Sequence, residues 1–277
     1  DETKLIKSIM SPKQKRLKNL ESFAEKLGHA WLHSSLIEGS DLSELPKNRE
    51  EAYFIQDRMA KVIGEPLSGW KVGATSKKMR ELDGHDDVIP GRIFQSVTFV
   101  GPMHTLPIGR FLNARVETEF AFRLRESIPV RKKPWIPTEL EDKAVLHPAI
   151  EIIGNRHQLR DALKSAKSLM TIADNGGGIG FVFGEGYENW QHLDFRNHTI
   201  HLQVDENPPA ENFLGEMRCN PLEALADLIN HLRGRKISLF KGDFISTGAT
   251  TVPQPFGIGA RVKANFGVIG NIEIVFT

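Results

Sequence analysis

The stretch NARVETEFAFRL, residues 113–124, alternates between apolar and polar side chains in the manner of a β-strand. Successive side chains of a strand point to opposite sides of the sheet. One face of this strand therefore consists of Val116, Thr118, Phe120, Phe122 and Leu124. The opposite face consists of Arg115, Glu117, Glu119, Ala121 and Arg123. A strand with two glutamates on one side is either half solvated, as in many antiparallel sheets, or directs two carboxylates at a common point.

Short β-rich segments flanked by Gly and Pro follow one another through most of the chain after residue 68. Besides the stretch above they comprise residues 69–75, 91–101, 147–154, 181–184, 198–205, 242–248, 260–267 and 270–276. Few helical segments separate them, which is not the pattern of a doubly wound parallel sheet. We therefore expect an α+β protein with a largely antiparallel or mixed, barrel-like β core and packed helices.

Helical periodicity is confined to four segments, residues 16–32, 48–64, 158–175 and 220–234. Asn48 is the expected N-cap of the second, and Gly64 its end. The fourth begins with Asn220 and Pro221, which suit the cap and first helical positions. The third carries Leu159, Leu163, Ala166 and Met170 on one stripe. We expect residues 1–66 to form a helical N-terminal segment packed on the core. Residues 67–277 then form the β domain that carries the site, and the two parts make one structural unit.

Composition excludes several classes of protein. The 277 residues include 36 basic and 35 acidic side chains, a balance that does not favour binding to nucleic acid or to anionic membranes. No run of eighteen apolar residues occurs, and the first twenty residues lack the apolar core of a signal peptide. Cys219 is the only cysteine, which excludes internal disulfides and fits a reducing compartment. We expect a cytoplasmic protein without membrane contact.

Glu151 lies in HPAIEII, residues 147–153, where an apolar strand is otherwise expected. A carboxylate in such surroundings must be paired, protonated or bound to a cation, because an isolated buried charge is very unfavourable. A salt bridge to one Arg or Lys would explain Glu151 alone. A metal ion would explain Glu117, Glu119 and Glu151 together. Ligation by oxygen alone suits Mg²⁺ or Mn²⁺ rather than zinc.

A basic residue would complement an anionic substrate beside such a metal. Lys71 lies in the short strand GWKVGATS, residues 69–76, between glycines that permit close approach of other backbone. The alternative is an ordinary lysine on a strand edge. The glycine-rich stretch ADNGGG, residues 173–178, follows a helix and precedes a strand, which is the reverse of a dinucleotide-binding motif. It is either a flexible turn or a loop that contacts a ligand.

Five motifs, taken in order, resemble the 2-keto-4-pentenoate hydratase family. They are GWKVGATS, ARVETEFAF, HPAIEII, IADNGGG followed by GFVFG, and STGAT followed by GARVKANFGVIGNIEIVF. The family includes 4-oxalocrotonate decarboxylases and belongs to the fumarylacetoacetate hydrolase superfamily. The resemblance extends from about residue 45 to residue 277. It implies the mixed β-roll core of that superfamily, a Mg²⁺ or Mn²⁺ site, a small 2-oxo acid substrate and assembly into homo-oligomers.

The resemblance also implies roles for individual residues. Glu117, Glu119 and Glu151 fall on the metal ligands of the family, and Lys71 on its active-site lysine. Other residues expected to bind substrate are Arg115, Asp174, Thr247 and Gly248. Arg115 could meet a second substrate carboxylate or form a supporting ion pair with a neighbouring glutamate, and the ion pair is the favoured alternative.

Two positions depart from the family pattern. Hydratases carry an Asp shortly before a strand that is GRIF here, and the corresponding residues are Ile89 and Pro90. Asp86 and Asp87 are near but out of register. The small polar residues of the glycine-rich loop are replaced by glycine.

The resulting hypothesis is a metal-dependent lyase of catabolism that acts on small 2-oxo or 2-hydroxy-dienoic acids, foremost a hydratase. A 4-oxalocrotonate-type decarboxylase and an acylpyruvate or fumarylacetoacetate-type hydrolase are alternatives, because all three reactions stabilise the same enolate. A further alternative is a non-catalytic partner subunit in a complex of hydratase and decarboxylase.

Overall fold

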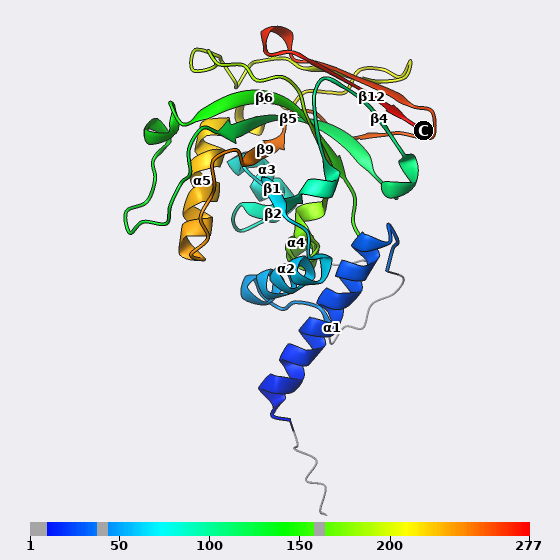
Figure 1. Cartoon of the computed structure of the whole chain (residues 1–277), viewed down its shortest axis with the longest axis vertical. Coiled ribbons are helices and arrows are strands. Elements are labelled where there is room, and N and C mark those ends of the chain that lie inside the picture. The colour runs from blue at the N-terminus through cyan, green and yellow to red at the C-terminus, as the bar shows by residue number, and fades with distance from the viewer. Residues whose placement is uncertain (1–9, 38–43, 158–163) are drawn as a thin grey trace, which may run out of the picture.

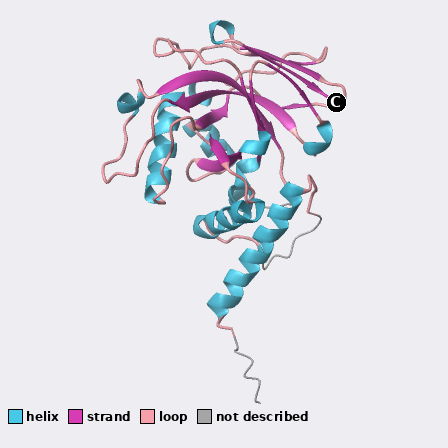
Figure 2. Ribbon diagram, in the orientation of Figure 1, coloured by secondary structure: helices cyan, strands magenta, loops and turns pink. Residues whose placement is uncertain are grey.

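The computed structural model describes residues 10–37, 44–157 and 164–277, and Figure 1 shows their arrangement. A large, strongly curved sheet occupies the middle of the molecule, with a smaller sheet on one side and helices on the other (Figure 2). The α+β class and mixed, barrel-like core expected from the sequence are confirmed. No helix among the described residues is both long and apolar enough to cross a bilayer.

The large sheet has the strand order β2-β1-β9-β5-β6-β7-β3, with β10 paired to β5. Its strands are β1 (Leu67–Gly73), β2 (Ile89–Phe94), β3 (Thr98–Val100), β5 (Arg115–Leu124), β6 (Ala144–Ile153), β7 (Gly178–Phe183), β9 (Phe244–Ala249) and β10 (Gln254–Pro255). The β1–β9 and β3–β7 pairs are parallel, and the other pairs are antiparallel. The two ten-residue strands β5 and β6 form the centre, so the stretch at residues 113–124 contains an interior strand of the sheet.

The small sheet covers the apolar face of β5 and β6. Its order is β4-β12-β11-β8, and its strands are β4 (Met103–Leu106), β8 (His201–Val204), β11 (Arg261–Asn265) and β12 (Asn271–Phe276). Phe120 and Ile150 from the large sheet share one buried cluster with Val262 and Ile274 from the small one. Burying one face of β5 against this sheet leaves its other face, with the glutamates, directed into the curve of the large sheet.

Three helices form a layer on the side opposite the small sheet. They are α1 (Pro12–Leu32), α2 (Arg49–Ile63) and α4 (Lys164–Ala173), and α1 extends away from the sheets (Figure 1). Leu27 of α1, Ile55 of α2 and Met170 of α4 belong to one apolar cluster that also contains Ile89 of β2. The stripe residues Leu159 and Leu163 lie outside the described residues. The division of the chain at residue 66 stays a prediction.

The caps expected for two helices are confirmed. Asn48 accepts a hydrogen bond from the Glu51 N–H at the start of α2, and Gly64 ends that helix in the left-handed region. The helix α5 (Pro221–Gly234) packs beside β9 and is capped by Asn220. One short helix, α3 (Lys77–Asp83), connects β1 to the loop that precedes β2.

Candidate metal centre and active-site cavity

Strand register brings the three glutamates together. Glu117 of β5 lies directly opposite Glu151 of β6, and Glu119 follows two residues later on the same face of β5. One carboxylate oxygen from each lies within 4.8 Å of the other two. All three side chains are buried, with Glu151 fully so. The interpretation of this face as an ordinary solvated surface is therefore wrong.

Lys71 reaches the same cluster from β1. Its Nζ atom lies 3.2 Å from Oε1 of Glu151 and donates a 2.7 Å hydrogen bond to the carbonyl of Gly176. Because β1 pairs with β2 on one side and β9 on the other, Lys71 is not on a sheet edge. The salt bridge considered for Glu151 thus exists, but a single ammonium cannot balance three carboxylates.

The charges of the cluster perturb one another. Burial raises the pKa of Glu117 and of Glu119 well above the usual range, and the charge of Glu151 raises both further. Burial acts to lower the pKa of Lys71, but the charges of the three glutamates outweigh it and raise that pKa. A group of three carboxylates and one ammonium carries two excess negative charges when ionised. A divalent cation would balance them.

The donor set fits a hard divalent cation. Both carboxylate oxygens of Glu151 are buried, and among the described residues the 3.2 Å ion pair between Oε1 and Lys71 is the one contact with a cation, which leaves Oε2 without a partner. Three points that lie within 4.8 Å of one another have a common point within about 2.8 Å of each (4.8 divided by the square root of three). Oxygen ligands bind Mg²⁺ at about 2.1 Å and Ca²⁺ at about 2.3–2.6 Å, so a small closure of the side chains would complete the site.

The hydroxyl of Ser246 supports this arrangement. It donates a hydrogen bond to Glu119, and Ser246 pairs with Lys71 across the parallel strands β9 and β1. Sequence reasoning did not identify Ser246. The alternation of FISTG, residues 244–248, predicts a strand that contains Ser246. It does not predict that this strand, β9, lies between β1 and β5.

Glycines in the loop before β7 permit the close packing around Lys71 and Glu151. A Cβ at Gly176 would lie 2.9 Å from Cδ of Lys71, and Gly176 has a φ of +72°. A Cβ at Gly178 would lie 2.8 Å from Oε1 of Glu151. A side chain at Gly178 would therefore require Glu151 or Phe181 to move from its present position. The loop packs directly against Lys71 and Glu151, and its contact with a ligand stays a prediction.

A cavity of 390 Å³ opens beside the cluster and contains Lys71 and Glu117 in its lining. Arg115 lines it as well, is exposed and forms no ion pair among the described residues. The supporting ion pair favoured for Arg115 is therefore not found, and its guanidinium remains available to a ligand. The polar lining residues that sequence reasoning missed are Asp83, His85, Asn113, Asn155 and Thr171.

Three predicted substrate residues do not line this cavity. Asp174 is buried beneath the glycine loop, where it accepts a hydrogen bond from the Arg156 N–H. Thr247 is fully buried and donates to the carbonyl of Phe120. A Cβ at Gly248 would lie 2.3 Å from Oγ1 of Thr75, so its place is also filled by protein. A substrate role for these residues stays a prediction, and their contacts are those of supporting structure.

The position of the family aspartate is occupied by an apolar side chain. Ile89 is buried, lies at the start of β2 and lines the cavity. Asp86 and Asp87 are exposed and are not in the cavity lining. Asp87 instead lines a separate 820 Å³ cavity together with Cys219. Neither carboxylate replaces the missing one.

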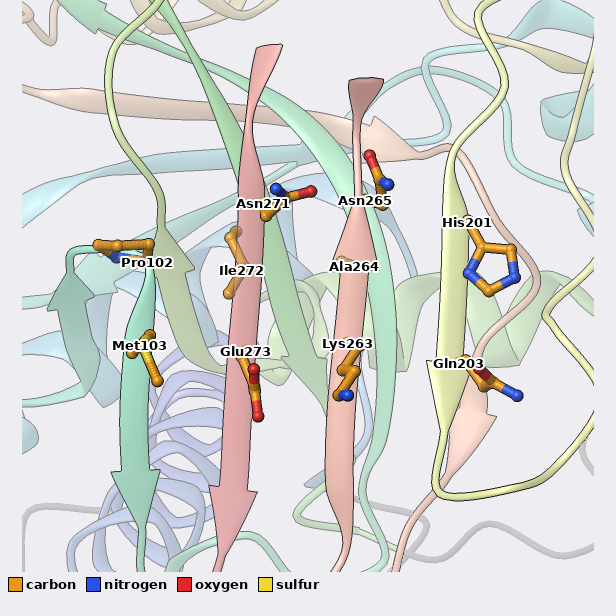
Figure 3. A pocket seen from close by; sticks show the side chains of 10 residues that line it. All are labelled: Pro102, Met103, His201, Gln203, Lys263, Ala264, Asn265, Asn271, Ile272 and Glu273. Atoms are coloured by element: carbon orange, nitrogen blue, oxygen red, sulfur yellow. The ribbon is translucent and has the colours of Figure 1, made fainter. Parts of the chain in front are cut away.

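Another hollow of 490 Å³ lies on the outer face of the small sheet (Figure 3). Met103, Lys263 and Glu273 project from β4, β11 and β12 into it. It contains no group of carboxylates or histidines that could hold a metal among the described residues. The group of carboxylates that could hold a metal lies instead beside the cavity that Lys71 lines.

Comparison with curated proteins finds distant relatives along nearly the whole chain, although no family model matches. The chain is 26% identical over 263 residues to 2-oxo-hept-4-ene-1,7-dioate hydratase of Escherichia coli, covering 91% of this chain and 96% of that one. It is 25% identical over 229 residues to 2-keto-4-pentenoate hydratase of Burkholderia vietnamiensis strain G4, covering 82% and 85%.

Among solved structures, 4-oxalocrotonate decarboxylase from Pseudomonas putida G7, complexed with magnesium and adipate, has the same fold. The TM-score is 0.78 at 20% identity, with 94% of this chain and 98% of that chain covered. The relatives and the shared fold confirm the resemblance found in the sequence motifs: the chain is a distant relative of the 2-keto-4-pentenoate hydratases and has the fold of the fumarylacetoacetate hydrolase superfamily.

Proposed function

We propose that this protein is a divalent-metal-dependent hydro-lyase that adds water to small 2-oxo or 2-hydroxy-dienoic acids. One observation carries the proposal: three buried carboxylates and a buried lysine converge beside a cavity in a relative of hydratases. One lysine cannot balance the charges of three buried carboxylates, and unbalanced charges in the interior are strongly unfavourable. The cluster is therefore a functional arrangement rather than a stabilising one.

Glu117, Glu119 and Glu151 would hold Mg²⁺ or Mn²⁺ through one oxygen each. When bound there, such an ion acts as a Lewis acid that favours negative charge on the substrate's carboxylate and 2-oxo oxygens. Two features of the structure support this assignment. The ligands come from the two central strands of the large sheet, and all three side chains are buried.

The chain's own cations orient the substrate. Lys71 is held by Gly176 and by Glu151, so its ammonium has a fixed position at the inner end of the cavity. There it balances the substrate's first carboxylate and exchanges a proton with the carbon next to the 2-oxo group. Arg115, exposed in the cavity lining, would take a second carboxylate when the substrate is a dioate.

Two observations bear on the alternatives. The curated relatives at 25–26% identity are hydratases, whereas the decarboxylase likeness is one of fold at 20% identity. Hydration is therefore favoured over decarboxylation and over cleavage of acylpyruvates. The non-catalytic partner subunit is disfavoured because such a role needs neither the buried carboxylates nor Lys71.

Turnover assays test the proposal directly. Purified protein is stripped of metal, supplied with Mg²⁺ or Mn²⁺ and mixed with 2-hydroxypenta-2,4-dienoate or with 2-oxo-hept-4-ene-1,7-dioate. We expect metal-dependent loss of the dienoate's ultraviolet absorbance, or formation of the hydrated dioate, and no activity after chelation. Consumption of 4-oxalocrotonate or an acylpyruvate instead would assign one of the alternative reactions. Inactivity towards all four substrates would refute the enzyme class.

Assembly and location complete the proposal. We infer a homo-oligomer, as the resemblance implies, and a cytoplasmic location, which the single buried Cys219 supports. Light scattering of the purified chain tests the first. A complex with a decarboxylase or hydratase partner would show as co-elution of the two purified proteins.

A further inference from the structure

The cavity lacks the carboxylate that the family places near Ile89, yet addition of water needs a group that moves a proton. An alkene carbon and a neutral water react slowly unless a base removes the water's proton as the new bond forms. Ile89 cannot do so. The loop between α3 and β2, residues 84–88, brings a different side chain to the same cavity.

That side chain is His85. Its ring is half-buried and lines the cavity that also contains Lys71 and Glu117. Nδ1 lies 2.6 Å from Oγ of Ser168 on α4. In the tautomer protonated at Nδ1, the Ser168 hydroxyl accepts this hydrogen bond. Nε2 then keeps its lone pair and can accept a proton, and the ring that carries it lines the cavity.

We propose that His85 is the catalytic acid–base residue for water addition in this protein, with Ser168 as the residue that positions its ring. The assignment rests on the proposed hydratase function and names the group that takes over from the absent aspartate. Asp83 also lines the cavity, but it is exposed at the end of α3, and no side-chain hydrogen bond or ion pair with another described residue fixes its orientation towards substrate.

The proton-transfer step balances with these groups alone. The water oxygen forms a bond to C4 of the 2-oxo-3-enoate while one O–H bond breaks and its proton passes to Nε2 of His85. The electron pair of the C3–C4 double bond shifts towards the C2 oxygen and leaves an enolate. The Lys71 ammonium then donates a proton to C3, the imidazolium of His85 returns its proton to the Lys71 amine through solvent, and the net change is one added water.

The surroundings favour the neutral ring that this step requires. Burial lowers the pKa of His85 below its usual value. Asp83 and Asp86 act to raise that pKa, whereas Arg49 and Lys71 lower it further. The imidazole is therefore uncharged near pH 7 and able to accept a proton.

Substitution of His85 tests the assignment. In His85→Gln we expect kcat for hydration to fall by about 10²–10⁴-fold, the range typical of a lost acid–base group. We expect metal binding, followed by calorimetry, to stay within threefold of the wild type. Exchange of the C3 hydrogens of 2-oxopentanoate in D₂O, which depends on Lys71 and needs no water addition, should also persist. In His85→Ala, added imidazole should restore part of the hydration rate.

Two further variants complete the design. Ser168→Ala should lower kcat with little change in KM, because it loosens the ring without removing it. Asp87→Asn changes a carboxylate of the same loop that lies outside this cavity, and should retain wild-type hydration.

The outcomes separate this assignment from the proposed function. Hydration within threefold of wild type in His85→Gln would overturn the role of His85 alone. So would a parallel loss of hydration, C3 exchange and metal binding, since that pattern means general damage to the site. Absence of hydration by the wild type would overturn the proposed function and this assignment with it.

Discussion

Replacing Glu151 with glutamine separates the metal-binding role of this residue from its structural role. Glutamine has nearly the same volume, so the packing of β6 against β5 and β7 is retained. Glu151 is the glutamate that both faces Glu117 across the strands and contacts Lys71. Its substitution therefore removes two repulsions and one attraction from the metal-free protein, and one of three charged ligands from the metal-bound protein.

The change in electrostatic energy of the metal-free protein follows from the distances between Glu151 and its charged neighbours. At an effective dielectric constant of about 20, unit charges 4.8 Å apart repel by about 3.5 kcal/mol. Opposite charges at the 3.2 Å of the Lys71–Glu151 pair attract by about 5 kcal/mol. With neither or one of Glu117 and Glu119 protonated, the sum stays within about 2 kcal/mol of zero; with both protonated, only the lost attraction of about 5 kcal/mol remains. The metal-free variant should thus fold with a stability close to that of the wild type at a pH where at least one of these two glutamates is ionised.

The substitution has a larger effect on the stability of the metal-bound protein. Loss of a charged ligand should weaken binding by at least about 100-fold, since loss of groups that only support a ligand already weakens it by about 10–100-fold. Metal at 100 times its dissociation constant stabilises the wild type by about 2.7 kcal/mol. At about 2–4 °C per kcal/mol, the wild-type melting temperature should rise by about 5–10 °C. The variant should gain about 1 °C at the same metal concentration.

Thermal unfolding with and without Mg²⁺ or Mn²⁺ measures both quantities in one experiment. Glu185→Gln serves as the matched control, because Glu185 is exposed and lies outside the cluster. The control should respond to metal as the wild type does. An equal metal-induced shift in Glu151→Gln would remove Glu151 from the metal site and refute the reasoning.

Three further variants address neighbouring groups. Lys71→Met should lower kcat by about 10²–10⁴-fold while metal binding becomes no weaker, because a competing cation is removed; weaker metal binding would contradict this. Gly178→Ala places a methyl group 2.8 Å from a Glu151 oxygen and should destabilise the protein by about 1–3 kcal/mol in urea unfolding, unlike Gly109→Ala, which meets open space. Burial raises the pKa of Asp174 to about 7, so the folded state binds its proton more tightly and the unfolding free energy falls between about pH 4 and pH 7. Asp174→Asn should flatten that fall, and equal pH profiles would show that Asp174 does not contribute.

Much of the metal centre could be predicted because it depends on two local rules. Alternation places Glu117 and Glu119 on one face of a strand, and an apolar environment makes the charge of Glu151 conspicuous. Neither rule needs a knowledge of tertiary contacts. The family resemblance then predicted that Lys71 lies at the same site as the three glutamates. In the structure Glu117 lies opposite Glu151, and Lys71 contacts Glu151.

The rest of the site depends on contacts between distant segments. Ser246 reaches Glu119 only because β9 inserts between β1 and β5, a neighbour relation that strand patterns do not encode. His85 lies in a short polar loop, GHDD, that reads as ordinary surface. Its partner Ser168 is 83 residues away on α4. For the same reason Asp174 and Thr247 could be expected near the substrate although their polar atoms face other parts of the chain.

The fold also explains why this cluster persists despite its electrostatic strain. The glutamates occupy the most constrained strands of the molecule, where the small sheet buries the opposite faces of β5 and β6. A one-residue slip of either strand would transfer Phe120 and Ile150 out of that core and send the glutamates into it. The large apolar loss that follows keeps the carboxylates in place even when their charges repel. A metal-binding arrangement that is unfavourable by itself is therefore maintained by hydrophobic packing on the other side of the same two strands, which predicts that core substitutions at Phe120 should weaken metal binding without touching a ligand.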